Sequence, residues 1–215
     1  GLMNFTFYSS LAHLPIGVAV TIEFIGPLSL AAALSRRWLD AVAVAAAAAG
    51  VVLISEALST PFADLEKTGI ALALLAGAFW AAYIVLAGRT GGEFPKLEGL
   101  ALAMVVATVV TLPLGITSAP TWSPDILLKA FGIAVLSSVL PYSLELLALR
   151  RLSAKVFGIL LSLEPAFAAL AGLLVLGQVL SPTQLVGMAL VVAASALVLG
   201  LGARQRPDPA EAAST

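Results

Sequence analysis

The stretch Ser162-Leu163-Glu164-Pro165 lies in the middle of an apolar run from Val156 to Leu176. A second stretch, Glu23-Phe24-Ile25-Gly26-Pro27, lies within the apolar run from Pro15 to Leu34. Each run therefore carries one glutamate and one proline near its middle. Runs of about 20 apolar residues are long enough to cross a lipid bilayer as helices. The two stretches predict membrane helices that each hold an acid away from water.

The overall composition is that of a membrane protein. Of the 215 residues, 60% are hydrophobic and 11% are charged, and the mean hydropathy is +1.07. Soluble domains are about 45–50% apolar and about 25% charged. The net charge of −1 excludes nucleic-acid binding by counterion release. Without cysteine, and with His13 as the single histidine, the chain lacks thiolate and paired-histidine metal motifs, so we expect no metal and no cofactor.

Seven segments are long and apolar enough to be spanning helices, which predicts an all-α, polytopic helical bundle. They are Pro15–Leu34, Leu39–Leu58, Gly69–Ala87, Leu97–Ile116, Ile126–Leu149, Val156–Leu176 and Leu185–Leu201. Leu2–Leu11 is apolar but too short to cross, and it lacks the basic flank and cleavage site of a signal peptide. Because the first residue is Gly1, we expect the chain to begin inside a helix.

The basic residues are distributed unevenly between the two sides of this predicted bundle. Only Lys67 and Lys129 fall on one side, and nine of the eleven fall on the other. The nine are Arg36, Arg37, Arg89, Lys96, Arg150, Arg151, Lys155, Arg204 and Arg206. The positive-inside rule makes their side cytoplasmic. The C-terminus is then cytoplasmic, and helices Pro15–Leu34 and Val156–Leu176 cross the membrane in opposite directions.

The two acid-bearing helices also align with each other. Pairing Leu14 with Leu152 pairs Pro27 with Pro165 at a constant offset of 138 residues. The aligned helices are five spans apart, so the two copies form an inverted repeat, a design that places the site near the membrane midplane. At this offset about 70 residues of the first copy precede Gly1, and the intact protein should have ten helices, five in each repeat.

This alignment predicts the organisation of the chain. Residues 1–58 are expected to be the end of a first repeat, 59–68 an external loop and 69–203 a second repeat. Residues 204–215, which are rich in proline and alanine, are expected to be a disordered cytoplasmic tail.

Short motifs extend over nearly the whole chain. They are Met3-Asn4-Phe5-Thr6-Phe7-Tyr8-Ser9, Pro15-Ile16-Gly17-Val18-Ala19-Val20, Glu23-Phe24-Ile25-Gly26-Pro27-Leu28, Phe79-Trp80-Ala81-Ala82-Tyr83, Leu140-Pro141-Tyr142-Ser143-Leu144-Glu145, Phe157-Gly158 and Ser162-Leu163-Glu164-Pro165-Ala166. In this order they resemble the EamA-type transporters of the drug/metabolite transporter superfamily, above all the bacterial threonine/homoserine exporters. The resemblance implies ten helices in two inverted repeats and export of small metabolites across the inner membrane. Gln178 departs from the family pattern, which has a glutamate there.

Three acids, Glu23, Glu145 and Glu164, lie within predicted spans. A charged side chain at the bilayer centre costs roughly 2.5–3.5 kcal/mol on insertion scales, so each acid should face the bundle interior. A glutamate that changes protonation can couple solute movement to a proton gradient, and we expect such a role for Glu23 and Glu164. The alternative is a permanently protonated acid bonded to a neighbouring helix. For Glu145, an ion pair with Arg150 or Arg151 is equally compatible with the sequence.

Polar and aromatic residues supply the other candidates for a substrate site. Asn4 and Tyr8 share a helix face because they are four residues apart. At the offset of 138, Asn4 aligns with Tyr142, which precedes Ser143. Trp80 and Tyr83 lie too deep for an interfacial belt, and the resemblance favours a cavity-lining role for them. Ser162, in the second acid motif, is a further candidate for substrate binding or proton coupling. For the polar groups, hydrogen bonds between helices remain the alternative.

Pro27 and Pro165 each leave one carbonyl without its helical hydrogen bond, those of Glu23 and Leu161 respectively. Within a membrane such a carbonyl is tolerated only where protein or cavity water satisfies it. The two prolines therefore predict paired kinks that can serve as hinges. The alternative is the general frequency of proline in membrane helices.

Together these features predict a secondary-active exporter in the bacterial inner membrane that works by alternating access. Amino acids such as threonine and homoserine are the expected solutes, protons are the expected coupling ion, and a homodimer is compatible with the sequence. The alternatives are a transporter of another small solute or drug, and a channel or scaffold that does not transport. An enzyme is disfavoured because the chain has no HExxH motif, no aspartyl-protease pair and no cysteine.

Overall fold

The computed structural model describes residues 1–61, 65–90, 97–116, 122–177 and 179–203. Its long elements are α1 (Leu2–Ser10), α2 (Ile16–Ala33), α3 (Trp38–Ile54), α4 (Lys67–Thr90), α5 (Glu98–Ile116), α6 (Pro124–Ala134), α7 (Leu140–Leu149), α8 (Ala154–Leu160), α9 (Leu163–Leu176) and α10 (Pro182–Ala203). A 3₁₀ turn, η1 (Ala57–Ser59), follows α3, and a π-helical turn, η4 (Val135–Val139), joins α6 to α7. Because these described residues contain no strand, the all-α class is confirmed.

Five helical stretches in the described residues are long and apolar enough to cross a membrane. They are Ile16–Ala33, Lys67–Arg89, Pro124–Leu149, Ala154–Val175 and Pro182–Leu199. The other two segments expected to span, Trp38–Ile54 and Glu98–Pro113, are apolar helices of shorter length. The predicted count of seven spans therefore stays a prediction. The predicted tail after residue 203 and Gln178 lie outside the described residues.

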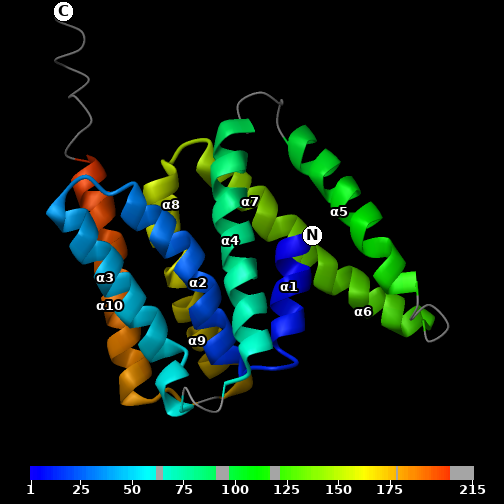
Figure 1. Ribbon diagram of the computed structural model, residues 1–215, viewed down its shortest axis with the longest axis horizontal. Helices are drawn as coiled ribbons and strands as arrows, with labels where there is room; N and C mark the ends of the chain where they lie inside the picture. The colour runs from blue at the N-terminus through cyan, green and yellow to red at the C-terminus, as the bar shows by residue number, and fades with distance from the viewer. Residues whose placement is uncertain (62–64, 91–96, 117–121, 178, 204–215) are drawn as a thin grey trace, which may run out of the picture.

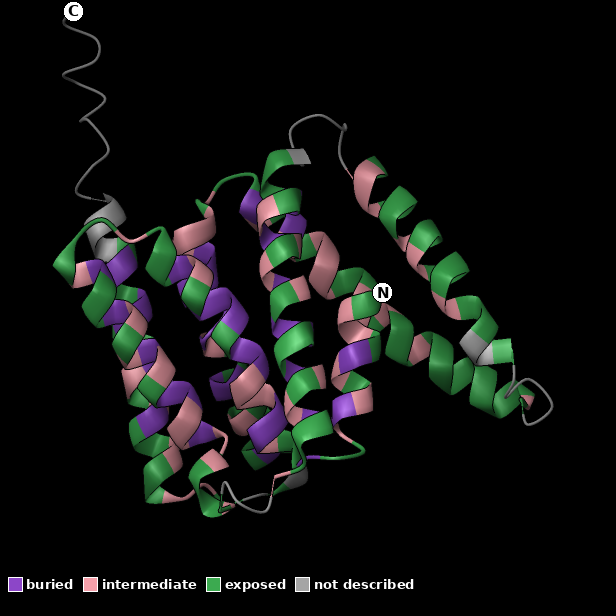
Figure 2. Ribbon diagram, in the orientation of Figure 1, coloured by how far each residue is buried: buried purple, intermediate pink, exposed green. Residues whose placement is uncertain are grey.

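The helices pack most closely where α3 meets α10 and where α4 meets α2 and α1, and α2 also packs against α8 (Figure 1). In Figure 1, α3 runs from the top of the view to the bottom, whereas α10 runs from the bottom to the top. The buried residues follow these contacts and include Phe24, Val51, Trp80, Ile84 and Val191. By contrast, α5 and α6 extend away from the bundle and are exposed along most of their length (Figure 2). The core therefore lies among α2, α3, α4, α8 and α10.

One end of the bundle carries most of the described basic residues. The α2–α3 connection holds Arg36 and Arg37, the residues after α7 are Arg150 and Arg151, and Arg89 lies in the last turn of α4. Figure 1 shows the two connections and the last turn of α4 at the same end of the bundle. We call this the basic end. Lys67, at the first residue of α4, lies at the opposite end.

Helices α2 and α4 cross with their backbones in contact at two glycines. A Cβ atom added to Gly26 would lie 2.0 Å from the carbonyl oxygen of Gly77. A Cβ atom added to Gly77 would lie 2.5 Å from the carbonyl oxygen of Glu23. This is the carbonyl that Pro27 leaves without a helical partner. The α4 backbone therefore covers the exposed carbonyl, and only glycine permits so close an approach.

Helices α3 and α10 meet through a second pair of glycines, in a reciprocal contact. A Cβ atom added to Gly50 would lie 2.8 Å from the carbonyl oxygen of Gly187. A Cβ atom added to Gly187 would lie at the same distance, 2.8 Å, from the carbonyl oxygen of Gly50. Each glycine thus packs against the backbone of the other, and the two antiparallel helices approach closely along this contact.

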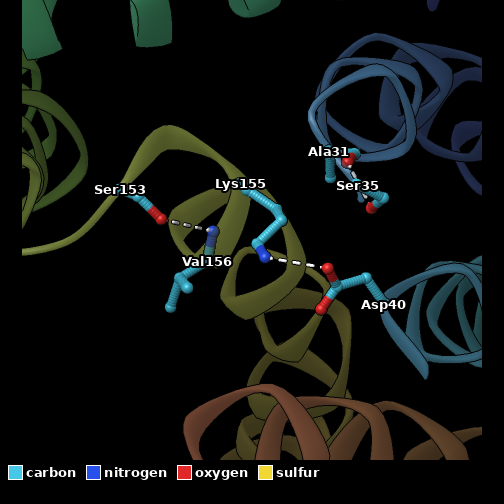
Figure 3. Close-up of polar contacts among 6 residues, drawn as sticks. All are labelled: Ala31, Ser35, Asp40, Ser153, Lys155 and Val156. Atoms are coloured by element: carbon cyan, nitrogen blue, oxygen red, sulfur yellow. Dashed lines mark hydrogen bonds and ion pairs between the residues drawn. The ribbon is translucent and has the colours of Figure 1, made fainter. Parts of the chain in front are cut away.

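At the basic end an ion pair joins the first turn of α3 to the first turn of α8 (Figure 3). The Nζ atom of Lys155 lies 2.9 Å from Oδ2 of Asp40. The Asp40 side chain is 3% exposed and that of Lys155 is 27% exposed. The backbone of Arg36 and Arg37 also hydrogen-bonds the Asp40 carboxylate. Because Asp40 is buried, its charge depends on these partners.

Replacing Lys155 by methionine is expected to destabilise the fold by about 3 kcal/mol, because it leaves a buried carboxylate without its counter-charge. Lys129→Met is the matched control, since Lys129 pairs with Asp125 at an exposed site one helical turn away. Such exposed pairs contribute less than about 1 kcal/mol. Thermal unfolding in detergent measures both. Equal shifts for the two variants would contradict the assigned role, and adding Asp40→Asn to Lys155→Met should restore part of the loss.

Candidate functional site

The predicted helix from Val156 to Leu176 is broken in two just before its acid. α8 ends at Leu160 and α9 begins at Leu163. The Ser162 hydroxyl is fully buried and donates a hydrogen bond to the carbonyl of Ile159 at 2.6 Å. The backbone N–H of Glu164 donates to the carbonyl of Leu161 at 2.9 Å, which satisfies the carbonyl that Pro165 leaves free. The break therefore needs no water, and it places Glu164 in the first turn of α9.

The two prolines differ in their local structure. Pro27 lies inside α2, which continues as a helix from Ile16 to Ala33. Pro165 lies in the first turn of α9, after the break. Both prolines are buried. Only the second copy of the motif therefore interrupts its helix, and the hinge role of either proline stays a prediction.

Three helices each contribute one carboxyl group to an interacting set. Glu23 of α2 is 7% exposed, Glu145 of α7 is partly buried, and Glu164 of α9 is exposed. The Glu164 carboxyl is close enough to interact electrostatically with the carboxyls of both Glu23 and Glu145. Glu164 is therefore the acid that interacts with each of the other two. Sequence analysis expected both Glu23 and Glu164 to face the bundle interior; Glu23 is buried there, whereas Glu164 is exposed.

Aromatic and amide groups from α1, α4 and α7 surround these acids. The Tyr142 hydroxyl donates a hydrogen bond to Oδ1 of Asn4 at 3.1 Å. The rings of Tyr83 and Tyr142 pack edge to face with centroids 5.7 Å apart. The Tyr83 hydroxyl lies beside the Glu145 carboxyl. We call the group formed by Asn4, Glu23, Tyr83, Tyr142, Glu145 and Glu164 the central site.

Comparison with known proteins identifies the family. Residues 67–200 match the EamA-like transporter family. The chain belongs to this family. The threonine/homoserine exporter RhtA of Escherichia coli (strain K12) is 40% identical to it over 197 residues, which are 91% of this chain and 66% of RhtA. RhtA of Salmonella typhimurium (strain LT2) gives the same identity and coverage. The chain therefore spans just under two thirds of the length of these relatives.

A solved crystal structure supports the fold. It matches with a TM-score of 0.72 at 19% sequence identity, and the match covers 93% of this chain and 74% of that one. At this identity the likeness concerns the fold alone. Together with the five long apolar helices, family membership makes this chain a multi-pass membrane protein.

The remaining predicted site residues of this EamA chain lie around the central site or beside it. Trp80 is 7% exposed, and its ring packs edge to face against Phe24 at a centroid distance of 5.0 Å. Tyr8 is 66% exposed, and its ring packs against Phe7. The Ser143 hydroxyl donates to the carbonyl of Val139 at 2.6 Å, within its own helical segment. The hydroxyl groups of Ser143 and Ser162 therefore both donate hydrogen bonds to backbone carbonyls.

For Glu145, the ion pair with Arg150 or Arg151 stays a prediction. The groups that act on this carboxyl are Glu164 and the Tyr83 hydroxyl. Tyr83 Oη and Glu145 Oε2 are both buried, and neither makes a well-formed hydrogen bond among the described residues. Glu145 therefore has one buried carboxyl oxygen, Oε2, that can still accept a hydrogen bond.

Sequence analysis missed the polar pairs at the two ends of the bundle. Asp40 and Lys155 form the ion pair of Figure 3 at the basic end. At the opposite end His13 Nδ1 contacts Oε2 of Glu66, just before α4. The signal available in the sequence was charge position, because Asp40 and Lys155 each lie in the first turn of a helix that starts at the predicted cytoplasmic side. Which two charges meet was set only by packing of α3 against α8.

Proposed function

We propose that the intact protein is a secondary-active exporter of small amino compounds in the bacterial inner membrane, with threonine and homoserine as its first candidate solutes. The observation that carries the proposal is the electrostatic interaction of Glu164 with both Glu23 and Glu145, three acids from three helices. Acids within membrane helices are costly and mark solute or proton pathways. The RhtA relatives, which are threonine/homoserine exporters, support the choice of solute. A scaffold that does not transport would carry the cost of these acids without a function for them.

An inverted repeat is proposed as the basis of alternating access. In two segments related by a twofold axis, residues near the axis contact their own counterparts. Asn4 and Tyr142, which are 138 residues apart, are hydrogen-bonded to each other, and 138 is the offset of the repeat. The reciprocal contact of Gly50 with Gly187, one residue short of that offset, supports the same axis. The proposed repeat mates are therefore α1 with α7, α2 with α8 and α9, and α3 with α10.

The proposed transport step moves these mates against each other around the central site. The break at Leu161–Ser162 is the proposed hinge of the second repeat, because the α-helical hydrogen bonding is interrupted there. The basic end is proposed to face the cytoplasm, in keeping with the positive-inside rule.

Different tasks are proposed for the two motif acids. Glu164 is exposed and lies within reach of both other carboxyls, so it is the proposed contact for the solute and for the coupling proton. Glu23 is almost completely buried, and its carbonyl packs against Gly77. Glu23 is therefore proposed to hold a proton inside the bundle and to fix the position of α2. Their positions relative to Pro27 and Pro165 also differ, which fits unequal tasks.

Export of labelled threonine tests the proposal. Expression of the full-length protein in a bacterial strain that lacks its own threonine exporters should lower intracellular labelled threonine. The control is the same strain with an equal amount of the Glu164→Gln variant in the membrane. Accumulation that is the same in both strains, and the same with labelled homoserine, would overturn the proposed solutes.

A further inference from the structure

The central site contains acids but no basic side chain. Residues 2–35, 68–88, 130–149 and 156–176, which include the spans that supply the site, contain no lysine or arginine. Lysines near these intervals are engaged elsewhere, since Lys155 pairs with Asp40 and Lys129 with Asp125. The described arginines belong to the connections and helix ends at the basic end. A solute in this site therefore meets negative charge and finds no positive side chain.

The site also holds buried polar atoms without a well-formed hydrogen bond. Glu23 is 7% exposed, and its carboxyl interacts electrostatically with that of Glu164. Tyr83 Oη and Glu145 Oε2 are buried without a well-formed hydrogen bond. A buried polar group without a partner is costly, so the Glu145 carboxyl can accept a donor that the solute supplies. A primary ammonium supplies three N–H donors and the opposite charge in one group.

The aromatic rings suit the same ligand group. Tyr83 and Tyr142 pack edge to face next to Glu145, and Trp80 packs against Phe24 on the helix that carries Glu23. Faces of tyrosine and tryptophan rings attract cations within about 6 Å, and more strongly where water is excluded. The acids and the ring faces together therefore suit the binding of an ammonium group.

A solute carboxylate would find only neutral donors here. Oδ1 of Asn4 accepts from Tyr142, which leaves the Asn4 amide N–H groups as donors. The Tyr142 hydroxyl already donates to Asn4, and the hydroxyls of Ser143 and Ser162 already donate to backbone carbonyls. Recognition of a carboxylate usually relies on arginine or on several well-placed donors. The site can hold a carboxylate but has little with which to select one.

We propose that this site recognises its solute by the ammonium group and does not require the carboxylate. Small primary amines, including amino-acid amides and amino alcohols, are then solutes of the same site. The inference rests on the proposed export function and narrows it to a class of solute. N-acylated amino acids, which keep the carboxylate and lose the ammonium, are excluded.

Competition in proteoliposomes that contain the purified full-length protein tests the inference. The measured quantity is counterflow of labelled threonine against three unlabelled compounds: threonine amide, 1-amino-2-propanol and N-acetylthreonine. The amide and the amino alcohol should inhibit at concentrations within about tenfold of unlabelled threonine. N-acetylthreonine should bind at least about 30-fold more weakly, because it leaves the buried acids without their counter-charge. Counterflow of labelled threonine amide should itself be measurable.

The outcomes separate this inference from the proposed function. Threonine counterflow that N-acetylthreonine inhibits, and that the amide does not, would overturn ammonium recognition and leave threonine export standing. Transport of the amide without transport of threonine would support ammonium recognition and overturn the proposed solutes. Absence of counterflow with every compound would remove both.

A variant adds a second readout. Glu145→Gln should weaken inhibition by threonine and by threonine amide to the same extent, because both compounds present the same ammonium. Glu145→Asp should keep most of it. A loss confined to threonine in Glu145→Gln would instead assign Glu145 to the carboxylate end of the solute and would contradict the inference.

Discussion

Replacing Glu164 by glutamine is expected to lower threonine export by about 100-fold or more, whereas Glu164→Asp should retain measurable export. Glutamine keeps the size of the side chain but can neither carry charge nor exchange a proton. Glu164 is the acid that interacts with both Glu23 and Glu145, so its loss affects the whole group. The measurement is the initial rate of labelled threonine export from cells, divided by the amount of full-length protein in the membrane.

Stability measurements separate this effect from misfolding. Glu164→Gln should unfold at the same temperature as the wild type or slightly higher, because a neutral amide beside two other acids removes repulsion. A variant that exports at the wild-type rate would remove Glu164 from the mechanism. Equal loss in Glu164→Gln and Glu164→Asp, with intact protein in the membrane, would show that side-chain length rather than the acid matters there.

Hydrophobic run length was enough to predict the helical class and the approximate positions of the long helices. It did not predict the interruption of Val156–Leu176 at Leu161–Ser162, or the π-helical turn at Val135–Val139. Both interruptions lie within apolar sequence, where hydropathy gives no signal. Proline alone also does not decide a break, since α2 continues through Pro27 while the helix before Pro165 ends. The difference depends on how each free carbonyl is satisfied.

The sequence predicted which residues form the central site better than it predicted which of them contact each other. Interior acids are costly in a membrane, so Glu23, Glu145 and Glu164 were visible as exceptions to the apolar pattern. The repeat offset aligns Asn4 with Tyr142, and these two residues are hydrogen-bonded in the structure. Relative exposure could not be read from the sequence. Glu23 is buried because α2 packs against α4 and α8, whereas Glu164 in α9 is exposed.

The contact between α2 and α4 is expected to depend strictly on Gly77. Gly77→Ala should destabilise the protein by about 3 kcal/mol, because its Cβ atom would lie 2.5 Å from the Glu23 carbonyl oxygen and neither backbone can yield cheaply. Gly88→Ala in the same helix is the matched control, since a Cβ atom there would meet nothing within 4 Å. It should be neutral or stabilise by up to about 1 kcal/mol, because alanine favours helix over glycine. Thermal unfolding in detergent compares the two variants.

The same substitution tests how the fold positions the site. The clash at Gly77 acts on the carbonyl of Glu23, so α2 must shift away from α4 and carry the Glu23 side chain with it. Gly77→Ala should therefore lower threonine export even at a temperature where the protein remains folded, and Gly88→Ala should not. A stable Gly77→Ala variant with unchanged export would mean that the α2–α4 crossing is looser than its backbone contacts imply. Within a membrane the free carbonyl of Glu23 must be shielded from lipid. The α4 backbone at Gly77 shields it, so the glycine crossing of α2 and α4 also fixes the position of the buried acid Glu23.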